Sequence, residues 1–464
     1  MNPQSMKLLV TRLIIFLFIS GASQAAGQTR WQQQEFILGT FYDPPFDVRS
    51  RDTVKDGANF RLAKDAGFNL LTGTQDQFRM DHSFEGMKYA LSLANKAGLK
   101  YMVTDSRMYP VYDFPFQSSV AKTMVEQYKQ LAVPLRKTMY AYNLCDEPHH
   151  SSEHLKRVTE WKRFFESNDP EKLVYLNLVA SYAPNYSWGG FRGKDDGVLD
   201  EQERVAYEAY LSSYIDSLRP AVVCFDHYPF FKSGKVRRDY FYNLAIIKKK
   251  AGKTPFWAVP MTVDHMAYAD PTEAQMSFMY MCPVAYGAKG LIVFTFWELP
   301  DREYRLAVVD NSGRPTAKYP ILKRLNLWVS RVLGPLVMQL RHLAVIHASR
   351  FPDNQQYVED TINSGSPLVV SLGNDKLMAG VFENSSSYYV LVVNKSLEPI
   401  TSADLTLKIV VPKVAFAPRV GEIDDVKPIV YTETATRVDP VLKRSIVRIP
   451  VIAGGEGIVM RIKK

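Results

Sequence analysis

Short apolar runs alternate with helical patterns between residue 36 and about residue 335, and this alternation limits the possible folds most. The runs that resemble strands cover residues 36–42, 68–71, 99–104, 139–146, 173–178, 221–225, 255–259 and 290–296. Between them apolar residues recur at helical spacing, as Leu155, Val158, Trp161 and Phe165 do. Eight strand–helix units over roughly 300 residues are typical of an α/β fold of the (β/α)₈ type, the TIM barrel.

An open, doubly wound sheet is the main alternative to a barrel. Such a sheet needs a glycine-rich phosphate turn after its first strand, and this strand ends at Asp43-Pro44-Pro45. From about residue 336 the helical spacing disappears, and short runs rich in Val, Ile and Tyr predict a β-sandwich. We therefore expect a barrel over residues 30–335 and a smaller sandwich domain over residues 336–464.

The first 25 residues have the features of a signal peptide. Lys7 and Arg12 flank a short apolar run at residues 13–19, and the small-residue sequence at 23–25 suits cleavage. The formal charge of +9 falls to +7 without this segment, because it contains those two cations and no acids. No later run reaches the roughly 18 apolar residues of a membrane helix. We expect an exported protein, soluble in the periplasm or outside the cell after cleavage.

Two basic clusters, at residues 235–238 and 248–250, are the densest in the mature chain. A solvated helix face explains each better than a nucleic-acid site, because no nucleic-acid motif accompanies them. The composition therefore predicts no nucleic-acid partner and leaves the oligomeric state open.

Cysteine and histidine usage predicts neither a disulfide framework nor a metal centre. Two of the three cysteines, Cys145 and Cys224, lie in apolar strand-like runs, which predicts buried free thiols there. The third is Cys282. The histidines that follow residue 148 lack the cysteine–histidine spacing of zinc sites. No metal and no cofactor are expected.

Carboxylates and aromatic residues follow most of the predicted strands. In a (β/α)₈ barrel, reactive groups gather at the C-terminal ends of the strands, and these ends supply Asp43, Asp105, Asp146, Glu147, Asn177, Asp226, Tyr228, Asp264, His265, Trp297 and Glu298. Paired acids with aromatic faces suit glycosidic bond cleavage. Each acid alone is more simply a helix cap or a loop hydrogen-bonder, so the prediction depends on their shared location.

Four motifs resemble the glycoside hydrolases of clan A, in particular exported bacterial proteins that are beta-galactosidase-like (family 42-like). They are Tyr-Asn-Leu-Cys-Asp-Glu-Pro at 142–148, Asp-His-Tyr-Pro at 226–229, Pro-Phe-Trp at 255–257 and Phe-Thr-Phe-Trp at 294–297. The resemblance implies that Glu147 is the general acid/base and that Trp297 is the aromatic floor beneath the sugar.

The sequence departs from that family at the seventh strand, where the family has its nucleophilic glutamate. Residues 259–263 contain no acid, so the second catalytic carboxyl group would be Glu298, then Asp264, then Asp226, in that order of preference. The expected substrate-binding residues are Asp146, Asn177, Asp226, Tyr228, Trp297, Asp43 and Asp105. The expected function is an exported glycoside hydrolase acting on a polysaccharide or oligosaccharide. The alternatives are a barrel that binds carbohydrate without cleaving it and, more remotely, a structural protein.

Overall fold

The computed structural model describes residues 30–42, 44–73, 82–182, 197–298, 304–352, 355–356 and 366–464. The predicted signal peptide and Asp43 lie outside these ranges. Within them, no helix is both long enough and apolar enough to cross a lipid bilayer.

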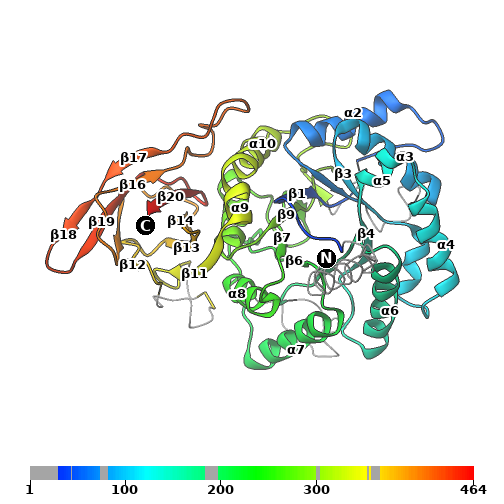
Figure 1. The fold of residues 1–464 in the computed structure, drawn as a ribbon, viewed down its shortest axis with the longest axis horizontal. Helices are drawn as coiled ribbons and strands as arrows, with labels where there is room; N and C mark the ends of the chain where they lie inside the picture. The colour runs from blue at the N-terminus through cyan, green and yellow to red at the C-terminus, as the bar shows by residue number, and fades with distance from the viewer. Residues whose placement is uncertain are drawn as a thin grey trace, which may run out of the picture.

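Eight parallel strands close into a barrel, which confirms the predicted fold class (Figure 1). In order around the barrel they are β1 (Ile37–Thr40), β2 (Leu70–Thr72), β3 (Lys100–Val103), β4 (Met139–Asp146), β5 (Leu173–Leu178), β6 (Val223–Asp226), β7 (Phe256–Val259) and β9 (Gly290–Val293). β9 pairs with both β7 and β1, which completes the cylinder.

Helices surround the barrel between successive strands (Figure 1). They are α2 (Thr53–Asp65), α3 (Phe84–Ala97), α4 (Ser118–Lys129), α5 (Val133–Thr138), α6 (Ser152–Asn168), α7 (Glu201–Leu218), α8 (Tyr240–Ala251), α9 (Glu273–Ala285) and α10 (Lys318–Trp328). Their apolar stripes cover the strands, as Val158, Trp161 and Phe165 of α6 show by being completely buried. This burial excludes water from the strand backbones and makes the barrel a rigid support for its loops.

A tryptophan fills the barrel interior where glycine leaves room for it. A Cβ atom at Gly290 would lie 2.7 Å from the Trp257 ring, so only glycine fits at that point of β9. The same indole ring stacks on Tyr175, with 6.0 Å between the ring centroids. The three cysteines are buried and free, as predicted for Cys145 and Cys224.

Two details of the helix boundaries differ from the sequence-based expectation. The cap of α9 is Thr272, in a capping box with Gln275, whereas Asp-Pro-Thr-Glu at 270–273 suggested Asp270 as the cap. Asp270 instead contacts Lys318. The last barrel helix was expected to stop at Gly334-Pro335, but it continues through a π-helical turn (Val329–Leu333) into α11 (Gly334–Gln339). Proline is tolerated there because it sits in the first turn of α11.

The C-terminal part forms two antiparallel sheets, as the sequence predicted. The first sheet has the order β11 (Arg341–His347), β13 (Leu377–Glu383), β14 (Ser387–Asn394), β20 (Gly457–Lys463), β16 (Lys413–Phe416) and β17 (Thr432–Ala435). The second has the order β12 (Val369–Ser371), β15 (Ala403–Leu407), β19 (Arg444–Ile449) and β18 (Arg437–Asp439). A separate apolar core fills the space between them. Strands β11, β16, β17 and β18 were not anticipated from the sequence, and the last three of these are only three or four residues long.

The first of these sheets packs directly against the barrel helices α9 and α10 (Figure 1). Gly380 of β13 and Gly455 before β20 lie so close to α9 that a Cβ atom would approach the carbonyl oxygens of Ala285 and Ala274 to 2.3 Å and 1.9 Å. On α10, the indole of Trp328 donates to the Pro418 carbonyl oxygen at 2.8 Å. The two glycines therefore permit the close contact between the parts.

We predict that Gly380→Ala lowers the free energy of unfolding by about 1–3 kcal/mol, because the new methyl group forces β13 away from the backbone of α9. The measurement is urea unfolding followed by circular dichroism. Gly57→Ala is the matched control. Its methyl group would meet the mobile end of Arg61 at 3.1 Å, inside α2, where alanine favours the helix. Equal stability of the two variants would show that the close approach at Gly380 is unimportant.

Candidate active site

One amide group joins two carboxyl groups at the C-terminal end of the barrel. Asp146 ends β4, and the strand register places it beside Asn177 of β5. The side-chain nitrogen of Asn177 donates to Oδ1 of Asp146 at 3.0 Å and to Oδ1 of Asp226, the last residue of β6, at 3.1 Å. Because both bonds share one nitrogen atom, the two oxygens lie within about 6 Å of each other.

Both carboxyl groups have pKa values well above those of ordinary aspartates. Burial raises the pKa of Asp146 to about 6, against the opposing effect of the Asn177 hydrogen bond. Burial and then the nearby charge of Asp146 raise the pKa of Asp226 to about 7. Near neutral pH this pair therefore exchanges protons with its surroundings, as general acids and bases must.

Glu147 lies next to this pair in an unusual backbone conformation. Its φ angle is 46°, in the left-handed region that non-glycine residues seldom adopt. Its amide donates to the Asn177 carbonyl oxygen at 2.9 Å, which anchors the turn. The surrounding protein, then the charges of Asp226 and Asp146, raise the pKa of Glu147 well above the usual value. The side chain is nevertheless accessible to solvent.

A tyrosine that sequence reasoning missed fixes the end of β4. The Tyr112 hydroxyl accepts from the Asp146 amide at 2.8 Å and donates to the Asp146 carbonyl oxygen at 3.0 Å. Tyr112 follows a 3₁₀ helix (Ser106–Val111) after β3, so a neighbouring loop holds the backbone that carries the two acids. No sequence signal pointed to it, because a lone tyrosine in a loop has no diagnostic spacing.

Five ring side chains from four strand ends form what we call the aromatic wall: Tyr42, Tyr228, His265, Phe294 and Tyr304. Phe294 is central, with ring contacts to each of the other four at centroid distances of 5.5–5.7 Å. Tyr228 links the wall to the acids, since burial and then Asp226, Tyr182, Glu147 and Asp146 raise the pKa of its hydroxyl. Sequence reasoning named Tyr228 and His265 among these rings, and it treated Phe294 as strand interior.

Trp297 and Glu298, predicted as the sugar floor and the leading second carboxyl group, are engaged elsewhere. Trp297 is only 1% exposed and packs against Phe296, so its ring has no open face in this structure. The Glu298 carboxylate accepts from the backbone amides of Leu306 and Asn311 at 3.4 Å and 3.2 Å. These two hydrogen bonds hold the loop after β9, so Glu298 has a structural role.

Asp264 and Asp105 also have partners outside the acid group. Asp264 lies in a two-residue strand, β8 (Asp264–His265), that pairs with β10 (Tyr304–Arg305), and it forms an ion pair with Lys232 at 2.5 Å. Asp105 is completely buried, accepts from Tyr128 at 2.8 Å and forms an ion pair with Arg107 at 2.6 Å. The carboxyl groups that act on Glu147 are those of Asp226 and Asp146.

The end of the seventh barrel strand carries no carboxyl group. Beyond Val259, Met261 bridges to Phe294, and the Thr262 hydroxyl donates to the Thr295 carbonyl oxygen at 2.7 Å. Both side chains are buried. The carboxyl group from another strand that raises the pKa of Glu147 is that of Asp226, at the end of β6.

Comparisons with known proteins bear on the fold. No protein-family model matches the chain, and no curated protein matches it. Among solved structures, a beta-galactosidase from Bacillus circulans sp. alkalophilus superposes with a TM-score of 0.58 over 92% of this chain and 99% of that one, at 9% identity. The chain shares the fold of a glycoside hydrolase.

Other solved structures are more distant. The xylanase Xyn30A of glycoside hydrolase family 30 from Clostridium acetobutylicum has a TM-score of 0.42 at 10% identity, over 94% of this chain and 97% of its own. An Anoxybacillus alpha-amylase has a TM-score of 0.46 at 9% identity, over 94% and 97%. Neither superposition says anything of the substrate of this chain.

We predict opposite effects on stability from two acid-to-amide variants. Asp105→Asn leaves Arg107 without its buried partner and should lower the free energy of unfolding by about 3 kcal/mol.

Glu147→Gln should raise the melting temperature at pH 8. The pKa of Glu147 is higher in the folded protein than in the unfolded chain, so ionised Glu147 lowers stability once the pH exceeds its pKa in the unfolded chain. The glutamine amide does not ionise and therefore does not lower stability in this way. The gain should vanish near pH 4. Thermal melts at both pH values test this; a loss of stability in Glu147→Gln at pH 8 would contradict it.

Proposed function

We propose that this chain is a glycoside hydrolase in which Glu147 protonates the glycosidic oxygen and Asp226 is the second catalytic carboxyl group. The observation that supports this most is the convergence of Asp146, Glu147 and Asp226 around Asn177 at the C-terminal end of the barrel. We also propose that residues 1–25 direct export, which would bring the enzyme to polysaccharides outside the cytoplasm.

Glu147 suits the role of proton donor for three reasons. The raised pKa favours the protonated form of its carboxyl group, which a proton donor needs. Solvent reaches the side chain, so a substrate can also reach it. Its left-handed backbone is held by a hydrogen bond to Asn177, and strained conformations of this kind concentrate at functional sites.

Asp226 and Asp146 have different parts in the proposal. The charge of Asp226 raises the pKa of Glu147 more than the charge of Asp146 does, so Asp226 is its stronger electrostatic partner. In its ionised form it would stabilise the oxocarbenium-like transition state, as nucleophile or as base. Asp146 and Asn177 would hold Asp226 in place and set its charge, and the aromatic wall would pack on the sugar ring.

Removing the proposed proton donor should abolish turnover and preserve binding. Glu147→Gln should lower kcat by ~10²-fold or more, and Asp226→Asn by a similar factor, with KM changed little. Release of reducing ends from a panel of polysaccharides and aryl glycosides provides the assay. Glu298→Gln is the control, because the Glu298 carboxylate holds a loop. A fall in kcat in Glu298→Gln alone would show that Glu298, and not Asp226, is the second catalytic carboxyl group.

The pH profile gives a separate test of Asp226. The kcat/KM value should rise as pH increases through about 7, where Asp226 becomes ionised. The charge of Asp146 raises the pKa of Asp226. Asp146→Asn should therefore move the rising limb to lower pH, by on the order of one unit. Asp264→Asn should leave it unmoved. An unchanged limb in Asp146→Asn would remove Asp226 from the mechanism.

The absence of an acid at the end of β7 supports a second candidate, a barrel that binds carbohydrate without cleaving it. Calorimetry on the same panel separates the two functions. Heat of binding without release of reducing ends, unchanged in Glu147→Gln, would favour the binding protein.

A further inference from the structure

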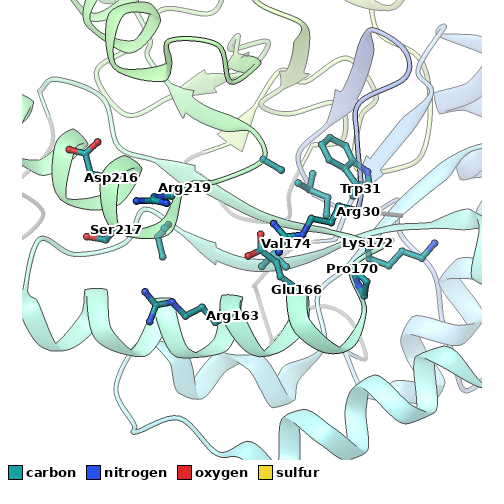
Figure 2. A pocket seen from close by; sticks show the side chains of 13 residues that line it. Arg30, Trp31, Arg163, Glu166, Pro170, Lys172, Val174, Asp216, Ser217 and Arg219 are labelled. Carbon is teal, nitrogen blue, oxygen red and sulfur yellow. The ribbon is translucent and has the colours of Figure 1, made fainter. Parts of the chain in front are cut away.

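The opposite end of the barrel carries a groove that the proposed function does not use. A hollow of about 780 Å³ lies where α6 and α7 end and β5 begins (Figure 2). A second hollow of about 420 Å³ lies where α8 ends and where β7 and β9 begin. Trp31 and Ala221 line both hollows, so the two adjoin. We call them together the basal groove. It lies at the N-terminal ends of the strands, away from Glu147.

The lining of the basal groove is strongly basic. Arg30, Arg163, Lys172 and Arg219 line the first hollow, along with Glu166 and Asp216 (Figure 2). Glu166 is already bound by Lys162, at 2.5 Å. The second hollow is lined by Lys248, Lys253 and Lys289, and its described lining contains no aspartate or glutamate. The cations therefore outnumber the acids that could neutralise them.

These cations lack ordinary partners and repel one another. Within the described residues, Arg163, Arg219, Lys248 and Lys289 form no ion pair through their side chains. Burial, followed by the charge of Lys248, lowers the pKa of Lys289 to about 8. Lys162 has a lowered pKa too, in part through Arg30 and Arg163. Exposed cations elsewhere in the described residues do form ion pairs, as Lys323 does with Asp65.

We propose that the basal groove binds an anionic polysaccharide through its carboxylate or sulfate groups. Two adjoining hollows suit an extended chain better than a single ion. Trp31, which is half-buried, supplies a ring on which a sugar can pack, and Ser217, Asp216 and Gln32 can hydrogen-bond hydroxyl groups. A lipid surface would need exposed apolar side chains around these cations, and the groove is recessed. This proposal is independent of the hydrolase assignment, because it concerns the other end of the barrel.

Calorimetry with tetragalacturonate, a sulfated chondroitin tetrasaccharide and neutral cellotetraose tests the proposal on the full mature chain. At low salt either anionic tetrasaccharide should bind at least tenfold more tightly than cellotetraose. Lys248→Gln/Lys289→Gln and Arg163→Gln/Arg219→Gln should each weaken that binding by about tenfold. Lys249→Gln is the matched control. Lys249 is exposed and follows Lys248 in α8, but it does not line the groove. The two double variants change only residues that line the groove and none of the candidate active site, so a loss of binding in them places the ligand in the groove.

The pH dependence adds a further criterion. An anionic ligand favours protonated lysines, so affinity should fall as pH rises through about 8, where Lys289 and Lys172 lose their protons. The proposal is overturned by equal affinity for cellotetraose or by an equal loss in Lys249→Gln. Tighter binding of a single-stranded oligonucleotide or of phosphatidylglycerol vesicles would also overturn it. Circular dichroism melts confirm that each variant is folded.

Discussion

The side-chain amide of Asn177 is the interaction on which the candidate site depends. It donates to carboxyl groups from two other strands, and the carbonyl oxygen of the same residue accepts from the amide of Glu147. Without those two donated bonds, Asp146 and Asp226 would repel each other inside a low-dielectric interior. The bonds compensate part of this repulsion, and the remainder appears as raised pKa values. One residue thus sets both the spacing and the charge of the acids.

The barrel separates charge between its two ends. The C-terminal ends of β4 and β6 carry acids, whereas the N-terminal ends of β5, β7 and β9 are surrounded by arginines and lysines. Parallel strands make this separation possible, because all of their C-terminal ends meet on one side of the barrel. Under the two proposals, one end would perform chemistry on a sugar while the other holds an anionic chain.

The end of the seventh barrel strand has no carboxyl group, and the side chains that follow it pack inward. Met261 and Thr262 are buried there and contact the segment that follows β9. Phe294 lies at the centre of the aromatic wall, whereas Trp297, three residues on, is buried against Phe296. The proposed mechanism therefore relies on β4 and β6, and its ring contacts would come from the half-buried members of the aromatic wall, Tyr42, His265 and Tyr304.

The sequence by itself determined the barrel, the following sheets and the strand ends where chemistry could occur, because apolar spacing records which faces are buried. It also singled out Asp146, Glu147, Asn177 and Asp226 as strand-end residues. It did not decide which of these acids meet. The tertiary structure did so, since register and hydrogen bonding joined Asp226 to Asp146 and tied Glu298 to its own loop. The role of Tyr112 and the basal groove became visible only in the tertiary structure. The residues involved lie far apart along the chain, and the sequence does not show which distant residues are in contact.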